Sequence, residues 1–419
     1  MRENLDYLIA SIHQYEPALD EYAPYFDKEA SKIMSELQPE CTAFEYFTYV
    51  SRICALAKEG HFGVGNWSGT IHRGIPKNAY AYLPVEVKII DGRIFVWEDI
   101  SNEAVLHRGD EILSINGRSV RQIIETLYAC TPGHGAIYSY LERTIEMVFP
   151  WLYYFHIEQP KTFEAAYRAA GEMATLSALT REQQVENFKE RNKSKAKPED
   201  EPFAFDIDGN KAYWYLPAFA RGKAESMGIK AKKEYKANFK EMQERGVEIL
   251  VIDLRGNMGG LHEFADEMVP YILQNDPDET WLKASESWEG KTKKHKLPKA
   301  SKYLFTGQIY VLVNGRTFSN GSTLTRYLKE YGDAIVIGEE TGSCYEGYAA
   351  GSKQFITLPH SKMSIGIPRY HISYPSAVKQ ATSDRGVIPT HIVKPSIEDL
   401  MEDRDVAVLL LMQLLDKQD

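Results

Sequence analysis

Ser319 stands where a serine hydroxyl could do chemistry. It lies in the stretch TFSNGSTLTRYLK, residues 317–329, between an apolar run and a helical pattern. A serine at such a junction can cap the helix, or it can act as a nucleophile whose hydroxyl projects from a strand-to-helix turn. Ser322 is a rival, but it stands one turn into the helix, where its hydroxyl more easily bonds back to a carbonyl. This stretch alone leaves both interpretations of Ser319 open.

A glycine-rich turn could supply the hydrogen-bond donors that a serine nucleophile needs. The stretch IDLRGNMGG, residues 252–260, has three glycines after a buried apolar run. Such a turn can simply reverse the chain, or its exposed amides can hold an anion. It matches neither a Walker A loop nor a GxGxxG fingerprint. We expect an oxyanion hole formed by the amide of Asn320 together with that of Gly259 or Gly260.

A serine nucleophile also requires a base, and histidine is the usual one. His61, in KEGHFGVGNW, lies between glycines just after a helical pattern. A lone histidine is more often a surface residue, and the chain has 11 of them. His72, His262 and His371 are the main rivals of His61 by position.

The elements that would position these residues follow from the periodicity. From residue 203 onward, apolar runs alternate with helical patterns, which predicts an α/β domain with a largely parallel sheet. In such sheets, sites form at the carboxyl ends of the strands, where both motifs lie. Residues 1 to about 60 read as helices, Asp91-Gly92 as a hairpin turn, and residues 131 to about 195 as mostly helical. The charged segment 191–202 reads as a linker or loop tip.

Composition limits the classes of protein. With 419 residues, of which 43% are hydrophobic, the chain is expected to form several domains. A net charge of −10 argues against nucleic-acid binding. We see no membrane helix and no signal peptide, and four scattered cysteines indicate neither a zinc site nor a disulfide framework.

Two parts of the sequence resemble known protein families. The segment VLHRGDEILSINGRSV, residues 105–120, resembles the core of a PDZ domain, a module that binds extended peptides. A purely bracing role for this module is the alternative. Together with the later motifs, the order of segments resembles peptidase family S41, which includes the C-terminal processing proteases, the tricorn core and the retinoid-binding relatives. The matching residues are Asp253, Leu254, Arg255, Asn257, Gly259 and Gly260, then Thr317 and Ser319, then Gly338, Glu339, Thr341 and Gly342, and finally Gly386, Val387 and Pro389.

The resemblance implies one of two catalytic arrangements. Processing proteases pair the serine with a lysine, but Cys344 stands in that position here, and Lys353 lies further on. The tricorn-like branch uses an early histidine, matched by His61, so the resemblance favours a Ser-His pair. That branch also has a glutamate where this chain has Ser383, with Asp384 one residue away. The third member is therefore expected at Asp384 or Ser383, with Glu340 as a distant alternative.

The resemblance also implies an architecture. We expect an α/β, α+β multidomain chain whose core is of the ClpP/crotonase-like type. The predicted parts are an N-terminal helical region carrying His61 (1–75), a PDZ-like domain (76–130), a helical connector with a charged linker (131–202) and the α/β catalytic core (203–419).

The function that follows is that of a serine endopeptidase acting on peptides or unfolded proteins, with no metal or cofactor. Two alternatives stay open: a Ser-His esterase or amidase, and a non-catalytic binding protein on the same fold. The family resemblance favours a periplasmic or secreted location, with a cytoplasmic one left open. Oligomeric state does not follow from the sequence.

Overall fold

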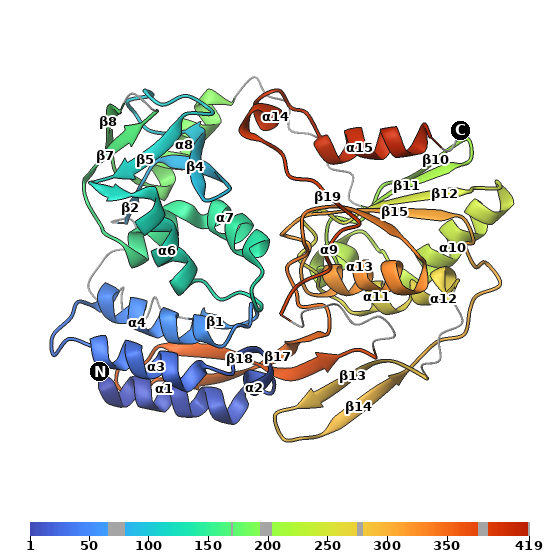
Figure 1. The fold of residues 1–419 in the computed structure, drawn as a ribbon, viewed down its shortest axis with the longest axis horizontal. Helices are drawn as coiled ribbons and strands as arrows, with labels where there is room; N and C mark the ends of the chain where they lie inside the picture. The colour runs from blue at the N-terminus through green and yellow to red at the C-terminus, as the bar shows by residue number, and fades with distance from the viewer. Residues whose placement is uncertain (66–79, 169–170, 193–202, 275–279, 376–383, 418–419) are drawn as a thin grey trace.

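The chain folds into three regions. The α/β core lies at the right of Figure 1, a β-rich module at the upper left, and a layer of N-terminal helices on a second sheet along the bottom. This arrangement is the α/β multidomain class predicted above. The computed structural model describes residues 1–65, 80–168, 171–192, 203–274, 280–375 and 384–417. The charged segment 193–202, Ser383 and His72 lie outside the described residues.

The core is a six-stranded sheet that is parallel except between its first two strands. Its strands in spatial order are β10 (Phe205–Asp208), β11 (Lys211–Tyr215), β12 (Ile249–Asp253), β15 (Gln308–Val313), β16 (Ile335–Gly338) and β19 (His391–Ile392). β12 is an unbroken apolar run because both faces of the sheet are covered. The carboxyl ends of β12 and β15 therefore lie side by side, and each leads into one of the two motifs.

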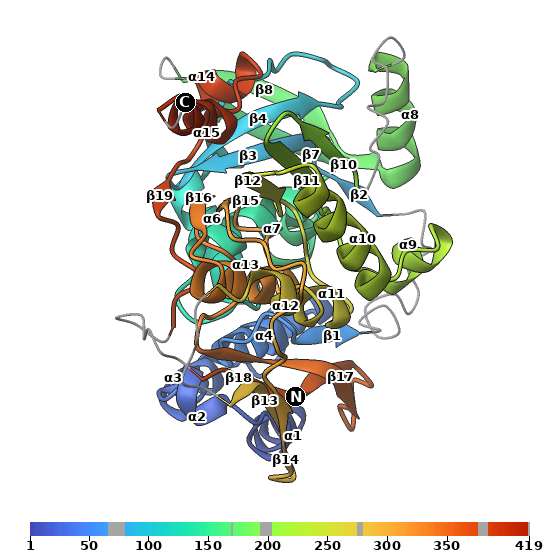
Figure 2. The same cartoon turned by 90° about the vertical axis from the view of Figure 1, so that its right-hand side faces the viewer.

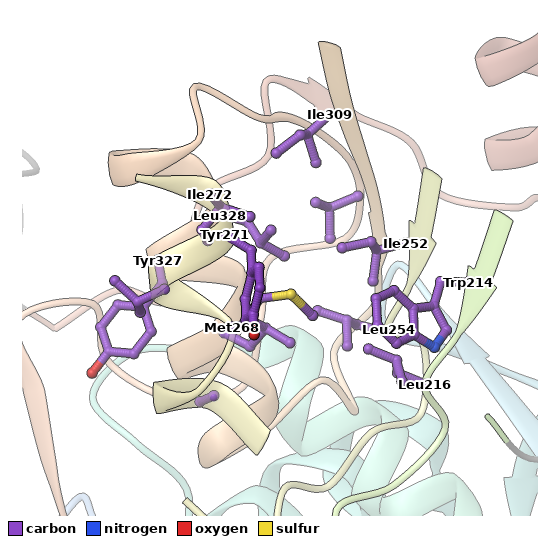
Figure 3. Close-up of a cluster of buried hydrophobic side chains, with 14 of the residues drawn as sticks. Trp214, Leu216, Ile252, Leu254, Met268, Tyr271, Ile272, Ile309, Tyr327 and Leu328 are labelled. Carbon is purple, nitrogen blue, oxygen red and sulfur yellow. The ribbon is translucent and has the colours of Figure 1, made fainter. Parts of the chain in front are cut away.

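Helices cover both faces of this sheet (Figures 1 and 2). Helix α15 (Val406–Leu415) packs on one face. The opposite face is covered by α9 (Arg221–Ser226), α10 (Ala231–Glu244), α11 (Glu263–Asp266), α12 (Val269–Ile272) and α13 (Asn320–Tyr331). Figure 3 shows side chains from these strands, such as Ile252, pointing toward others from α12 and α13, such as Leu328. Among the described residues, no helix is long and apolar enough to cross a lipid bilayer.

The N-terminal layer consists of helices packed on a second, antiparallel sheet. The helices are α1 (Arg2–Tyr15), α2 (Leu19–Tyr22), α3 (Phe26–Glu36) and α4 (Ala43–Leu56), as the periodicity predicted. The sheet contains β1 (Gly63–Gly65), β13 (Trp281–Ser287), β14 (Thr292–Lys296), β17 (Gly347–Thr357) and β18 (Ser364–Ser373). A capping box between Thr42 and Glu45 stabilises the start of α4. The turn that carries His61 follows the end of this helix.

The third region is a module with its own apolar core. The hairpin predicted at Asp91-Gly92 is present, with both residues at positive φ. The sheet contains β3 (Val85–Ile90), β4 (Arg93–Asp99), β5 (Glu111–Ile115), β6 (Arg118–Ser119), β7 (Thr162–Tyr167) and β8 (Glu172–Ser177), and a separate pair joins β2 (Ala81–Tyr82) to β9 (Leu179–Thr180). The accompanying helices are α6 (Val120–Cys130), α7 (Tyr138–His156) and α8 (Arg181–Arg191), and the short α14 (Ile397–Met401) precedes α15.

The prediction of a mostly helical segment over 131–195 is wrong in part. Residues 162–177 form the hairpin β7–β8, which extends the sheet through β5. Glu, Ala and Met in this stretch are good helix formers, but the sheet edge offers every second side chain a buried site. Packing against neighbouring strands therefore overrides the local preference.

Candidate active site

Ser319 lies between β15 and α13, as predicted. Its backbone has φ +52° and ψ −126°, a strained conformation for a residue with a side chain. Although Ser319 occupies the N-cap position of α13, its hydroxyl makes no capping hydrogen bond. Its Oγ instead lies 3.1 Å from Nε2 of His61. The interpretation of Ser319 as a simple helix cap is therefore wrong.

Ser322, the rival serine, has a supporting place in the same turn. Its hydroxyl donates to the carbonyl of Thr317 at 2.7 Å and accepts the amide of Ser343 at 3.2 Å. The hydroxyl oxygen of Ser343 accepts the amide of Ser319 at 2.8 Å. These bonds hold the strained turn in place and leave the Ser319 hydroxyl as the one that meets a histidine.

His61 is held on both sides of its ring. Nδ1 lies 2.8 Å from Oε1 of Glu59, and Nε2 faces Ser319. A proton on Nδ1, donated to this carboxylate, leaves Nε2 with a lone pair toward the serine hydroxyl. The ring lies 4.6 Å from the ring of Phe318 and stacks on Tyr348 at 5.6 Å between centroids. The histidine is thus fixed in the orientation that a general base requires.

Glu59 is a buried carboxylate with a full set of donors. Its side chain is 1% exposed. Oε1 accepts from the amide and Nδ1 of His61, each at 2.8 Å, and from Nε2 of His134. Oε2 accepts the amide of Ala349 at 2.7 Å. Burial would raise the pKa of Glu59, but the charges and hydrogen bonds of His134 and His61 outweigh burial and lower the pKa to about 2.

His134 lies behind the carboxylate, on the loop that joins α6 to α7. It is 1% exposed, and its ring packs against Phe318 and Tyr348. Burial lowers its pKa, and its Nδ1 is buried without a hydrogen-bond partner among the described residues. His134 therefore uses its one bonded nitrogen, Nε2, to donate to the carboxylate of Glu59.

The sequence placed the third member of the site wrongly. The carboxylate beside His61 is Glu59, whereas Asp384, on the loop beside residues 135 and 136, contributes a backbone carbonyl that accepts the amide of Ala136 at 2.9 Å. Ser383 lies outside the described residues. The side chain of Asp384 makes no hydrogen bond within the described part of the chain.

The distant alternative, Glu340, is occupied elsewhere. Its carboxylate accepts from Nε of Arg385 at 2.8 Å and from the amide of Gly386 at 2.7 Å. The sequence did hold one clue to the correct residue, because Glu59 stands two positions before His61. It held none for His134, which is 75 residues from Glu59 along the chain.

The glycine-rich turn at residues 256–260 lies against Ser319, where the oxyanion hole was predicted. A Cβ atom on Gly259 would lie 2.8 Å from Cβ of Ser319 and 2.7 Å from the amide nitrogen of Asn320, so this approach requires glycine. The Gly259 amide already donates to Oδ1 of Asn257 at 2.8 Å. The amides of Gly260 and Asn320 have no protein partner among the described residues, and the Asn320 side chain donates to the Gly260 carbonyl at 2.7 Å. Two of the three predicted donors are therefore available.

Neither Cys344, at the position of the lysine in the processing proteases, nor Lys353 provides a base. Cys344 is 3% exposed, and burial raises its pKa well above the ordinary value. The amine of Lys353 lies beside Gly63, where an added Cβ atom would be 2.9 Å from Nζ. Burial lowers the pKa of Lys353, but no hydrogen bond joins it to the serine in the described residues.

The rival histidines that the structure describes have other partners. His262 pairs with Asp266, with Nδ1 3.2 Å from a carboxylate oxygen. His371 lies 3.3 Å from the hydroxyl of Tyr22. His61 is therefore the histidine that meets Ser319.

Three side chains here could in principle ligate a metal. One ligand atom from each of Glu59, His61 and His134 lies within 4.8 Å of the others. The facing nitrogens of both histidines, however, point at the same carboxylate oxygen as hydrogen-bond donors. A cation would have to displace both protons.

The serine and histidine open into a cleft with a volume of about 1080 Å³. Its walls include Gly260 and Asn320 on the core side and strands β13, β14, β17 and β18 on the other. A cleft of this size accommodates an extended chain segment rather than a single small group.

Comparisons with known proteins agree with this arrangement. Residues 211–389 match the model of peptidase family S41. This core belongs to peptidase family S41. The chain is accordingly a serine-type peptidase, and the S41 part of the recognition made from the motifs is confirmed. No curated protein sequence matches the chain.

Among solved structures, the fold is similar to that of mature CPAF. The TM-score is 0.66 at 13% identity, over 99% of this chain and 97% of that one. The structure of mature CPAF complexed with lactacystin has a TM-score of 0.65 at 13% identity, covering 99% of this chain and 98% of that one. At this identity the likeness establishes the fold, so the roles of individual residues depend on the geometry described above.

Proposed function

We propose that this S41 peptidase is an endopeptidase with a Ser319–His61–Glu59 catalytic triad. The observation that carries the proposal is the 3.1 Å separation of Ser319 Oγ and His61 Nε2, with Nδ1 held by Glu59. As Oγ bonds to the peptide carbonyl carbon, its proton passes to Nε2. The same proton then protonates the leaving amine. A water molecule, deprotonated by His61, releases the acyl group in the second half of the reaction.

The developing negative charge falls on the carbonyl oxygen. We assign its stabilisation to the amides of Gly260 and Asn320, because neither has a partner in the described part of the chain and both lie beside the nucleophile. Loss of one such donor typically costs about 3 kcal/mol in the transition state. Glu59 would stabilise the imidazolium that forms on His61, as the acid of a triad does.

Peptide is the substrate that this site fits better than a small ester or amide. The cleft of about 1080 Å³ exceeds what a small acyl group would fill. The binding-protein alternative is disfavoured, because a strained serine and a correctly oriented histidine have no role in passive binding. We propose that the module containing the PDZ-like segment binds another part of the same substrate.

The decisive experiment is digestion of an unfolded protein and of a mixed peptide library, read by mass spectrometry. Wild type is expected to cleave both, and Ser319→Ala and His61→Ala are each expected to abolish cleavage. Ser35→Ala is the matched control, since it removes an exposed serine hydroxyl of α3 that does not line the cleft. Side-by-side rates on esters and peptides separate the esterase alternative. A folded wild type that cleaves neither would contradict the proposal.

A further inference from the structure

The floor of the cleft is the sheet formed by strands β17, β18, β13 and β14, in that order. Residues paired across neighbouring strands lie on one face. One such row runs from Tyr348 through Ile372 and Ser285 to Lys293, and all four line the cleft. At its first residue, the row contacts the ring of His61. The row therefore leads from the reacting serine to the outer edge of the sheet.

The chemical character changes along this floor. Near the serine it is apolar and aromatic, whereas β14 carries the sequence TKKHK. The cleft lining includes five lysines and arginines but only two glutamates, in a chain with a net charge of −10. The pKa of His295 on β14 is lowered by burial and by the charges of Lys283 and Lys293, as expected in a positive environment.

Some of these cations are already neutralised. Lys283 lies 2.7 Å from a carboxylate oxygen of Asp266, and Lys291 lies 2.9 Å from Glu289. Lys293 differs from them, because it is exposed and makes no ion pair within the part of the chain that the structure describes. It is the cation of this row that is available to a ligand.

We propose that the β14 end of the cleft is a subsite for an acidic side chain of the substrate, with Lys293 as its main cation. This inference rests on the proposed peptidase function and names the class of peptide that the cleft prefers. Apolar residues of the substrate would lie near the scissile bond, over Tyr348 and Ile372. A glutamate or aspartate further along would reach Lys293.

The spacing of strands gives the position of that acidic residue. Neighbouring strands are about 4.8 Å apart, so three steps from β17 to β14 cover about 14 Å. An extended peptide advances about 3.3 Å per residue. The acidic residue is therefore expected about four positions from the scissile bond, on one side of it.

The test uses synthetic peptides that share one cleavable sequence, taken from the library digestion. They carry Glu, Gln or Lys at the fourth position on one side of the bond or on the other. Wild type is expected to cleave the Glu peptide of one set about two- to fivefold faster than its Lys counterpart, because an exposed ion pair contributes modestly. High salt is expected to reduce this ratio. Lys293→Glu is expected to reverse it.

Lys294→Glu is the matched control. Lys294 is the next residue on the same strand, faces away from the cleft, and lies over the ring of Trp281. The variant changes net charge equally and is expected to keep the preference for Glu. Equal cleavage of Glu and Lys peptides by wild type would overturn the inference. An unchanged cleavage ratio in Lys293→Glu would overturn it as well, and would mean that Lys293 only protects an edge strand from pairing with another chain. Failure to cleave even the Gln peptides would instead refute the proposed peptidase mechanism.

Discussion

The two halves of the site are built in different ways. The serine half, with Ser319, Gly260 and Asn257, lies within residues 211–389, which match the family model. Short motifs at the ends of adjacent strands form it. The base half, with His61 and its partners, comes from outside that match, from the N-terminal layer and the module. The first half is fixed by local chain geometry and the second by contacts between regions.

The difference also appears in the forces that hold each half. The serine half depends on backbone shape, with positive φ at Ser319 and Gly259 and close approaches that exclude a Cβ atom. The base half depends on charge, with one buried carboxylate shared between two imidazoles. Substitutions that keep the shape of a side chain but remove its charge should therefore damage the base half most.

Glu59→Gln is expected to have the largest effect of this kind. The change keeps the shape but removes the charge that stabilises an imidazolium on His61, and an amide can hold the wrong tautomer. Loss of the triad acid typically lowers kcat about 10⁴-fold. Steady-state rates on the best library peptide, with circular dichroism as a check of folding, measure the effect.

Asp384→Asn is the matched variant at the position that the sequence favoured. Since the Asp384 side chain makes no hydrogen bond to the site among the residues that the structure describes, we expect kcat to change by no more than about twofold, as for an ordinary peripheral substitution. A large loss in Asp384→Asn together with an active Glu59→Gln would return the third catalytic role to the residue predicted from the family pattern.

This contrast shows how much the sequence could reveal. The strands β11, β12, β15 and β16, the serine turn and the glycine turn were all predicted, because each is set by periodicity or by a local motif. The base His61 followed from a family resemblance. Glu59 was within reach, two residues earlier, but the family pattern directed attention to the C-terminal Asp384.

His134 and the floor of the cleft could not be predicted. His134 reaches Glu59 only because α6 and α7 pack against α4, and no local pattern encodes that packing. The floor combines β13 and β14 with β17 and β18, whose pairing is non-local. At residues 162–177 the local pattern was misleading, because residues that favour helices form strands there.

The pH dependence of stability tests the charged state of the base half. The pKa of Glu59 is lowered to about 2, so its ionised form stabilises the fold fully above the usual pKa of about 4.5, and this contribution is lost as the pH falls toward 2. From pH 7 to pH 3 the loss is about 2 kcal/mol. The free energy of unfolding of wild type and of Glu59→Gln is measured by denaturant melts at both pH values. The difference between the two proteins should be smaller at pH 3 than at pH 7 by this amount. A constant gap would contradict an ionised Glu59.

His134→Phe is expected to have a smaller effect, on kcat rather than KM. It removes the Nε2–H donor that holds Glu59 against His61, and a hydrogen bond to a charged group contributes about 1.5–3 kcal/mol. If about half of this is lost in the transition state, kcat falls about tenfold.

His134→Gln separates a positioning role from simple packing. The glutamine amide can still donate to Glu59 but fills the space less well than phenylalanine. Recovery of kcat in His134→Gln, even with a lower melting temperature, would support positioning. A kcat that follows melting temperature across the two variants would reduce His134 to a packing residue.

The smallest effect is expected at Cys344, the position that carries the lysine of the processing proteases. Its thiol is buried beside Tyr22 and Phe318, and its raised pKa keeps it protonated, so iodoacetamide at pH 8 should leave it unlabelled in the folded protein. Cys344→Ala should change kcat by no more than about twofold. Cys344→Lys in a His61→Ala background should not restore cleavage, because an amine there would be buried among apolar rings. Rescue by that lysine would mean that the serine half can work with either kind of base.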